Sequence, residues 1–287
     1  MKMKFNPKKY KTTTREQWQT AAKAWYRWHP TLKKWLGPAT ELMLDMAKVQ
    51  RGQRILDIAA GAGEQSINAA KRVGSEGYVL ATDIAPKILD YAIQFAKENG
   101  VDNIEVKEMD GENLTLPDNS FDVVISRVGL IFFPDQQKAL KEMLRVLKPG
   151  GVVAAIVYST VEKNKFFSSP VSIIRKKAQL PPPLPGQPGP FSLGKPGVLE
   201  DAFRKAGFIN VRSKTVDAPL LMNSAKECVR FEYESFAALH QMLEGLSDSE
   251  KKAVWQEIED ELLQYEDQNV FRGPCELVVG VGQKKMD

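Results

Sequence analysis

The sequence contains few of the residues on which metal centres and disulfide-rich folds depend. Among 287 residues, only Cys228 and Cys275 are cysteines, and only His29 and His240 are histidines. Two cysteines cannot form a disulfide framework or a cysteine cluster for a metal. We therefore expect no bound metal and a protein that works in the reducing cytoplasm.

Long apolar runs are also absent. No stretch is long enough to cross a bilayer, and the opening Met-Lys-Met-Lys-Phe-Asn-Pro has no apolar segment behind its lysines. Such a start is not typical of a secretory signal. These features predict a cytoplasmic protein without an integral membrane segment.

Charge of one sign is not in large excess, because the formal net charge is only +4. No aromatic residues alternate with basic ones, as a nucleic-acid surface would require. We expect no nucleic-acid partner, and the oligomeric state is not predicted. The basic leader is interpreted as a solvated, poorly ordered tail rather than a nucleic-acid or membrane arm. Its lysines are Lys2, Lys4, Lys8, Lys9 and Lys11.

Strands and helices are predicted to alternate from residue 54 to residue 158. This alternation favours right-handed crossovers and a parallel sheet, and nearly continuous apolar strands indicate that both sheet faces are covered. The predicted strands are Arg54–Ile58, Gly77–Thr82, Asn103–Met109, Phe121–Ser126 and Val152–Tyr158, and the helices are Glu64–Val73, Pro86–Asn99 and Asp135–Leu147. With two later strands, Asn210–Val216 and Cys275–Val281, we predict a doubly wound, mostly parallel seven-stranded α/β fold.

The segment before this core is rich in tryptophan and is predicted to be helical from about residue 14. Thr14 and Gln17 have capping-box spacing, Pro30 is expected to end the first helix, and the second is expected to start near Pro38. Four of the five tryptophans lie here. We expect these helices, residues 1–48, to form a lid on the substrate side of the core, residues 49–160.

The pattern changes after Tyr158. Seven of the seventeen prolines fall within residues 180–197, which predicts an irregular segment and favours a wall of the site. Capping-box spacings at Ser224 and Ser247 predict helices over 224–245 and 247–267, and a further helix is predicted at Val198–Ala206. We divide this part into 161–222 (loop, core helix and strand), a helical cap at 223–272, and the last core strand at 273–287.

The most informative segment is Ile55-Leu56-Asp57-Ile58-Ala59-Ala60-Gly61-Ala62-Gly63-Glu64. A strand leads into a glycine turn that opens a helix, and such a helix N-terminus attracts an anion such as a pyrophosphate or a methionyl carboxylate. A dinucleotide fingerprint would need a third glycine where Ser66 stands. Asp83, after the second strand, can accept from two ribose hydroxyls, and Asp110, after the third, can accept from an adenine amino group.

With Phe121–Ser126 and the segment Leu144-Arg145-Val146-Leu147-Lys148-Pro149-Gly150-Gly151, these motifs resemble the class I S-adenosylmethionine-dependent methyltransferases. The closest resemblance is to the small-molecule methyltransferases of ubiquinone and menaquinone biosynthesis, over about residues 50–158. It implies S-adenosylmethionine as the cofactor. The implied binding residues are Asp57, Ala59, Gly61 and Gly63 at the methionyl end, Asp83, Ile84 and Ile88 at the ribose and adenine, Asp110, Gly111 and Glu112 around the adenine, and Arg127 and Val128 in the pocket. Ala59 replaces the family's first glycine, and Ile88 replaces a frequent methionine.

Methyl transfer from a sulfonium is an in-line displacement, so a base is needed only if the acceptor must lose a proton. His240 is a candidate base because a helix would place it on an apolar face with Tyr233 and Phe236. A hydrogen-bonded core histidine is the alternative interpretation. His29 and Tyr26 are further catalytic candidates, and His29 could instead be a helix cap. Arg127 is either a pocket residue or part of a structural ion pair, and Tyr158 and Glu232 are weaker polar candidates.

The sequence therefore predicts methyl transfer to a small, largely apolar acceptor, such as a quinone-like ring or a secondary metabolite. Three alternatives stay open. The first is an enzyme or binder that uses S-adenosylmethionine without methyl transfer. The second is a nucleic-acid or protein methyltransferase, and the third is a dehydrogenase. The absence of an Asn-Pro-Pro-Tyr type motif argues against the amino-group methylases of bases, and Ser66 argues against the dehydrogenase. The acceptor atom is not predicted.

Overall fold

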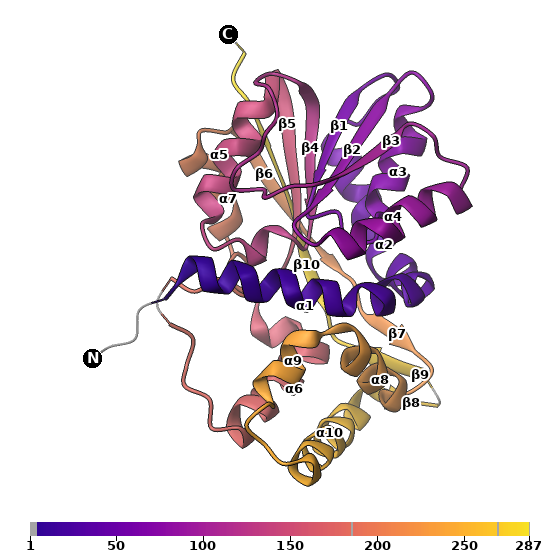
Figure 1. Ribbon diagram of the computed structural model, residues 1–287, viewed down its shortest axis with the longest axis vertical. Coiled ribbons are helices and arrows are strands. Elements are labelled where there is room, and N and C mark those ends of the chain that lie inside the picture. The colour runs from indigo at the N-terminus through magenta and orange to yellow at the C-terminus, as the bar shows by residue number, and fades with distance from the viewer. Residues whose placement is uncertain (1–4, 185, 269, 287) are drawn as a thin grey trace.

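The computed structural model describes residues 5–184, 186–268 and 270–286. Its centre is a seven-stranded sheet with the order β3-β2-β1-β4-β5-β10-β6 (Figure 1). All neighbouring strands are parallel except β10, which runs antiparallel to β5 and β6. The strands are β1 (Arg54–Ile58), β2 (Tyr78–Asp83), β3 (Ile104–Glu108), β4 (Phe121–Arg127), β5 (Leu147–Tyr158), β6 (Ile209–Asp217) and β10 (Glu276–Gln283). The predicted doubly wound fold is confirmed.

Helices cover both faces of this sheet. Figure 1 shows α5 and α7 on one side and α2, α3 and α4 on the other. The crossover helices are α3 (Glu64–Val73), α4 (Pro86–Glu98), α5 (Gln136–Val146) and α7 (Val198–Ala206). The central strands are buried on both faces, as Leu56, Ile125 and Ala155 illustrate with no exposed surface. This burial explains their continuous apolar sequences.

The N-terminal helices start earlier than the sequence predicts. The first, α1 (Pro7–Arg27), is capped by Asn6, whose Oδ1 accepts a hydrogen bond from the backbone N–H of Lys9. Lys8, Lys9 and Lys11 therefore belong to a helix, and their assignment to a disordered tail was wrong. Lys2 and Lys4 lie outside the described residues.

The second helix, α2 (His29–Met46), contains both prolines that were predicted to mark boundaries. Pro30 lies in its first turn, where a backbone N–H would have no intrahelical partner. Pro38 lies inside the helix rather than at its start. Packing explains why the helix continues, because Trp35, Leu36 and Ala39 on both sides of Pro38 are buried.

A helical cap lies below the carboxyl ends of the strands (Figure 1). Its members are α6 (Lys165–Lys177), α8 (Ala225–Ser235), α9 (Ala237–Met242) and α10 (Asp248–Leu262). The sequence did not predict α6. The predicted helix over 224–245 is broken at Phe236, whose φ of −110° and ψ of 78° are not helical. Ser247 and Glu250 form the expected capping box, whereas Ser224 only accepts from the N–H of Glu227.

A small antiparallel sheet was also missed. It has the order β7-β9-β8 and consists of β7 (Leu220–Met222), β8 (Glu266–Asp267) and β9 (Val270–Gly273). These strands are too short to give a clear alternating pattern. Within the described ranges, residues 180–197 form no helix or strand, as their proline content predicts. No helix in the described part of the chain has both the length and the apolar character needed to cross a bilayer.

Candidate active site

A cavity of about 660 Å³ lies between the carboxyl ends of the strands and the layer formed by α1 and the cap. One part is formed by the glycine turn after β1 and by the loops after β2, β3 and β4. The other part is formed by aromatic side chains of α1, α6 and the proline-rich segment, and by Phe236 at the end of α8. We call these parts the cofactor end and the aromatic chamber.

The turn after β1 has an unusual backbone that approaches the cavity closely. Ala59, Gly61 and Gly63 all have positive φ angles, of 58°, 58° and 85°. A Cβ on Gly63 would lie 2.8 Å from the Cβ of Ala92 on α4, so only glycine fits there. The Cβ of Ala59 is accommodated because residue 129 is glycine. The substitution of the family's first glycine by Ala59 is thus compatible with the turn, at a strain cost of about 1 kcal/mol.

Asp57 supports this turn from behind rather than lining the cavity. Its side chain has no exposed surface, and one carboxylate oxygen accepts from the hydroxyl of Ser66 at 2.5 Å. Burial raises the pKa of Asp57 to about 7, against the opposing effect of the Ser66 hydrogen bond. In the sequence, Ser66 only marked the absence of the third glycine of a dinucleotide fingerprint. In the structure, its hydroxyl donates to Asp57 and fixes that side chain.

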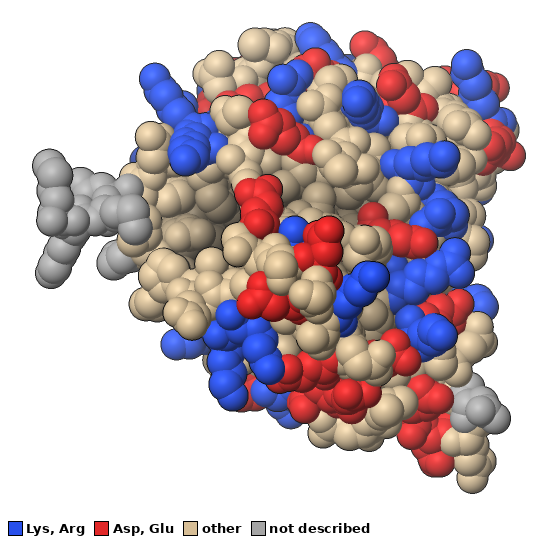
Figure 2. All heavy atoms as spheres, turned by 60° about the horizontal axis from the view of Figure 1, so that its bottom comes forward, with Lys and Arg blue, Asp and Glu red and all other residues tan. Residues whose placement is uncertain are grey.

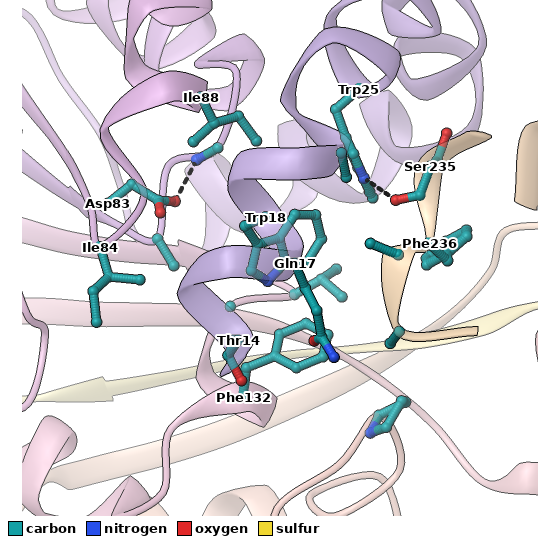
Figure 3. A pocket seen from close by; sticks show the side chains of 18 of the residues that line it. Thr14, Gln17, Trp18, Trp25, Asp83, Ile84, Ile88, Phe132, Ser235 and Phe236 are labelled. Atoms are coloured by element: carbon teal, nitrogen blue, oxygen red, sulfur yellow. Dashed lines mark hydrogen bonds between the residues drawn. The ribbon is translucent and has the colours of Figure 1, made fainter. Parts of the chain in front are cut away.

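Asp83 lies at the end of β2, where its carboxylate reaches the cavity (Figure 3). It accepts from the backbone N–H groups of Gly61 at 3.0 Å and Ala85 at 2.9 Å. Burial raises its pKa to about 6. A carboxylate has about four acceptor sites, so two are left for hydroxyl groups in the cavity. Ile84 and Ile88 line the cavity beside it.

Ion pairs connect the loop after β3 to α1. Asp110 and Glu112 each accept from Lys11 Nζ at 2.7 Å. Asp110 and Gly111 line the cavity, whereas Glu112 does not and also accepts from the N–H of Asp135 at 2.9 Å. Glu112 therefore fixes the loop, and its expected place beside the adenine is not what the structure shows. A Cβ on Gly111 would lie 2.7 Å from the ring of Phe133.

Arg127, at the end of β4, has both of the roles that the sequence left open. Its guanidinium forms an ion pair with Glu64 and donates to the hydroxyl of Thr40 at 3.1 Å. Both charged side chains are 7% exposed and both line the cavity. Val128, the next residue, also lines the cavity and has a φ of 57°.

The aromatic chamber is closed by bonds between α1 and the cap. Trp18 packs edge-to-face against Trp25 and Phe132, with ring centroids 5.2 and 5.6 Å away. Trp25 Nε1 donates to the carbonyl of Ser235 at 2.9 Å (Figure 3). Gln17 donates to Gln241 at 2.5 Å. Other aromatic lining residues are Tyr158, Phe167, Phe191 and Phe236.

The proline-rich segment contributes Pro183 and residues 187–192 to the wall, as expected from the sequence. The space-filling view shows a recess with uncharged walls, while charges of both signs are mixed on the surrounding surface (Figure 2).

The three catalytic candidates are placed very differently. His240 does not line the cavity: its Nε2 lies 2.5 Å from the carbonyl oxygen of Tyr233, and its ring packs on Tyr233 and Trp255. The expected helical face does not exist because the helix breaks at Phe236, so the orientation predicted for His240 was wrong. The ring of Tyr26 lines the cavity, but its hydroxyl donates to Glu98 at 2.6 Å near the surface.

His29 does line the cavity, at the start of α2. Its ring packs against Phe95 with centroids 4.3 Å apart, on the side of the cofactor end. Burial lowers the pKa of His29, which favours the neutral imidazole.

The sequence predicted the N-terminal segment as a lid over the site, but apart from Tyr26 it did not name the residues with which α1 lines the cavity. Its cavity-lining residues recur every three or four positions, which is the spacing of one helical face. They include Lys11, Thr14, Trp18, Ala21 and Trp25. This periodicity was present in the sequence and predicts the face, although not what the face contacts.

Residues 33–176 match the model of the ubiE/COQ5 methyltransferase family, which is half of the chain. The chain belongs to this family. The ubiquinone/menaquinone biosynthesis C-methyltransferase UbiE from Idiomarina loihiensis is 39% identical to this chain over 117 residues. The matched segment covers 40% of this chain and 47% of that protein. A demethylmenaquinone methyltransferase from Listeria welshimeri is 38% identical over 123 residues, covering 43% and 50%. The matched part thus spans about half the length of these curated relatives.

Solved structures agree with the fold of the ubiE/COQ5 family. The [4+2]-cyclase SpnF superposes with a TM-score of 0.57 at 17% identity, covering 94% of this chain and 98% of that chain. A phosphoethanolamine N-methyltransferase from Haemonchus contortus in complex with S-adenosyl-L-methionine has a TM-score of 0.53 at 19% identity, covering 87% and 53%. The predicted family and S-adenosylmethionine as its cofactor are confirmed.

Proposed function

We propose that this member of the ubiE/COQ5 family transfers a methyl group from S-adenosylmethionine to a small, largely apolar acceptor. The observation that carries the proposal is the single cavity that joins the glycine turn and Asp83 to the aromatic chamber. A donor and an acceptor bound in its two parts would meet at their junction. Holding two reactants in this way removes much of the entropic barrier to an in-line displacement.

The cofactor end fits S-adenosylmethionine in shape and in polar groups. The turn of Ala59, Gly61 and Gly63 would hold the methionyl end, where the buried Oε1 of cavity-lining Gln65 lacks a hydrogen-bond partner in the described protein. Asp83 would accept from the ribose hydroxyls. Ile84, Ile88, Asp110 and Gly111 would surround the adenine, while Arg127 and Val128 would close the methionyl side.

The sulfonium supplies an activated methyl group, so the task of the protein is to orient the reactants and to exclude water. Trp18, Trp25 and Phe132 pack edge-to-face and give the cavity an apolar wall that would exclude water. His29 is the one histidine that lines the cavity, and it packs beside Phe95 on the cofactor side. We therefore propose His29 as part of the cofactor wall and assign no base to His240.

The acceptor is proposed to carry a planar ring. The chamber walls are rich in aromatic side chains, which favour stacked or edge-to-face contact with flat apolar molecules. The names of the relatives point to quinone-like rings, which fit this chamber.

An alternative is that the chain uses the cofactor without transferring its methyl group. The same fold is found in a protein named as a [4+2]-cyclase, so the fold alone does not decide the reaction. Nucleic-acid or protein substrates are disfavoured because α1 encloses the chamber and the visible surface mixes charges of both signs (Figure 2). Cytoplasmic location stays a prediction.

Methyl-labelled S-adenosylmethionine tests the proposal directly. The purified protein is incubated with this cofactor and a small-molecule extract of bacterial cells, and organic-phase products are counted. We expect a labelled apolar product that disappears with Asp83→Ala. Binding of S-adenosylhomocysteine without any labelled product from quinol-rich extracts would favour the non-methylating alternative.

A further inference from the structure

Arg175 is a cationic residue in the wall of the aromatic chamber. It lies near the end of α6, where Phe167, Val171 and Arg175 line the cavity at intervals of four residues. This spacing places the three side chains on one side of the helix. Arg175 is half-buried, so its side chain is neither sealed in the interior nor surrounded by bulk water. Because it lines the cavity itself, a ligand in the chamber can reach it.

The other cations of the cavity wall are neutralised within the protein. Lys11 pairs with Asp110 at 2.7 Å, and Arg127 pairs with Glu64. Arg175 is the third lysine or arginine that lines the cavity, and its guanidinium forms no ion pair with any carboxylate among the described residues. The chamber wall therefore contains a positive charge for which the described protein supplies no anion.

The guanidinium of Arg175 has hydrogen-bond donors that the described protein does not use. Arginine stays charged in proteins and carries several N–H donors in a planar fork. One donor bonds to the carbonyl of Pro181, which fixes the side chain beside the proline-rich segment. Lys176 and Lys177, in the same last turn of α6, offset the partial negative charge of that helix end. The remaining donors match the paired oxygens of a carboxylate.

The chamber around this cation is rich in aromatic rings. The rings of Phe167 and Phe236 have centroids 4.8 Å apart, and those of Tyr158 and Phe191 have centroids 6.2 Å apart. All four residues line the cavity. Pockets with this composition bind a flat apolar body and use a few polar groups to fix its orientation. An aromatic ring that bears an anionic group combines both properties.

We propose that Arg175 binds a carboxylate on the acceptor, and that the acceptor is an aromatic acid whose ring lies in the aromatic chamber. This assignment rests on the proposed function, because it names the acceptor class for the same site. Arg175 is a specificity residue here, since it selects and orients the acceptor and takes no part in the transfer itself. A neutral ring of equal shape would give up the charge-assisted hydrogen bonds and bind more weakly.

Two probes of nearly equal shape test the selection. 2-Naphthoate carries a carboxylate where 2-naphthamide carries a neutral amide, and their affinities for the protein saturated with S-adenosylhomocysteine are measured by equilibrium dialysis. We expect the wild type to prefer 2-naphthoate about tenfold, because hydrogen bonds to charged groups are stronger than neutral ones. Arg175→Gln is expected to reduce this preference to about twofold or less.

A matched control separates direct binding from the general effect of charge. Lys176→Gln removes the same charge from the neighbouring residue, which is exposed and does not line the cavity. This variant should keep most of the preference. The neutral probe controls for structure, because a chamber that is merely loosened at Pro181 would lose affinity for both probes equally and keep their ratio.

Salt dependence tests the same contact without any variant, and so does not depend on the folding of Arg175→Gln. Raising sodium chloride from about 0.05 to about 0.5 M should weaken 2-naphthoate binding several-fold, because Arg175 is only half-buried and its charge is screened. The affinity for 2-naphthamide should change little over the same range.

The outcomes distinguish this assignment from the proposed function. Equal affinities for the two probes in the wild type, no measurable binding of 2-naphthoate, or binding of 2-naphthoate that does not respond to salt would overturn it. A preference kept in Arg175→Gln, or lost equally in Lys176→Gln, would overturn it as well. Calorimetry with S-adenosylhomocysteine alone reports on the cofactor end, and failure of the wild type to bind it would instead contradict the proposed function.

Discussion

The cofactor end and the aromatic chamber are built on different principles. The cofactor end uses backbone turns and strand-end carboxylates from one continuous stretch, such as the turn of Gly61 and Gly63 and the aspartate Asp83. The chamber is assembled from side chains on α1, α6, α8 and the proline-rich segment, which lie far apart along the chain. A site made by local backbone can be recognised in sequence, whereas a site made by distant side chains cannot.

The family match follows the same division. It covers residues 33–176, which include the glycine turn and the loops after β2, β3 and β4 but not α1, His29 or α8. The residues that would contact an acceptor thus come largely from segments beyond the match. This difference is a reason to expect that the cofactor is shared with the family while acceptor selection belongs to this chain's own helices.

The largest effect should come from a side chain on the glycine turn. Gly63→Val would place a Cβ 2.8 Å from Ala92 in a backbone region that branched residues avoid, so we expect loss of S-adenosylhomocysteine binding by about 100-fold or more. Calorimetry measures the affinity and circular dichroism checks the fold. Gly245→Ala is the matched control, because nothing lies within 4 Å of its added Cβ. Binding that survives Gly63→Val would show that the turn does not hold the cofactor.

Removal of the strand-end carboxylate should have the next largest effect. Asp83→Ala removes one or two charge-assisted hydrogen bonds to the ribose, which corresponds to about 2–4 kcal/mol of binding free energy. Isothermal titration with S-adenosylhomocysteine measures this loss. Asp118→Ala, a change on the surface, should leave the affinity unchanged. An unaltered affinity for the Asp83 variant would reject its assignment to the ribose.

The buried aspartate of β1 should make stability depend on pH. Its pKa is raised to about 7, from 3.8, because burial penalises the ionised form. A carboxyl with a raised pKa is more often protonated in the folded state, so its contribution to stability falls as pH rises from about 4 to 7. Urea unfolding at these two pH values measures the free energy of unfolding. From the lower to the higher pH, it should fall by about 2 kcal/mol more for the wild type than for Asp57→Asn. Parallel pH profiles for the two proteins would contradict the raised pKa.

The charged link between α1 and the cofactor end should have a moderate effect. Lys11→Gln breaks the ion pairs to Asp110 and Glu112, which are partly exposed. We therefore expect the binding free energy of S-adenosylhomocysteine to weaken by about 1 kcal/mol, with several-fold faster release. Stopped-flow fluorescence of Trp18 and its neighbours reports the release. Lys9→Gln, on the exposed side of the same helix, is the control. Equal release rates would mean that α1 does not retain the cofactor.

The smallest effect on the reaction is expected for His240. His240→Ala should leave turnover per folded molecule unchanged, because its ring packs on Tyr233 and Trp255 outside the cavity. A loss of stability of about 1 kcal/mol is expected from the removed packing. Product formation and the thermal midpoint are measured in parallel. Slower turnover with normal stability would restore His240 as a candidate base.

The sequence by itself determined the alternating core and most of the cofactor end. The helices Glu64–Val73 and Val198–Ala206 agree with their predicted bounds, and Asp83, the aspartate that ends β2, lines the cavity as the motif indicated. These features depend on hydrogen bonds and apolar spacing within about twenty residues, which a local pattern records.

Only the tertiary structure decided where α1 docks, that Lys11 binds the loop after β3, and that His240 lies outside the cavity. Lys11 and Asp110 are separated by 99 residues, and no local pattern specifies such a pair. The sequence predicts one continuous helix here, but the helix breaks at Phe236, whose ring packs against Trp25 and Phe167. This packing outweighs the local helical preference and changes the orientation of His240. Long-range packing, which is settled only when the chain folds, therefore fixed the aromatic chamber.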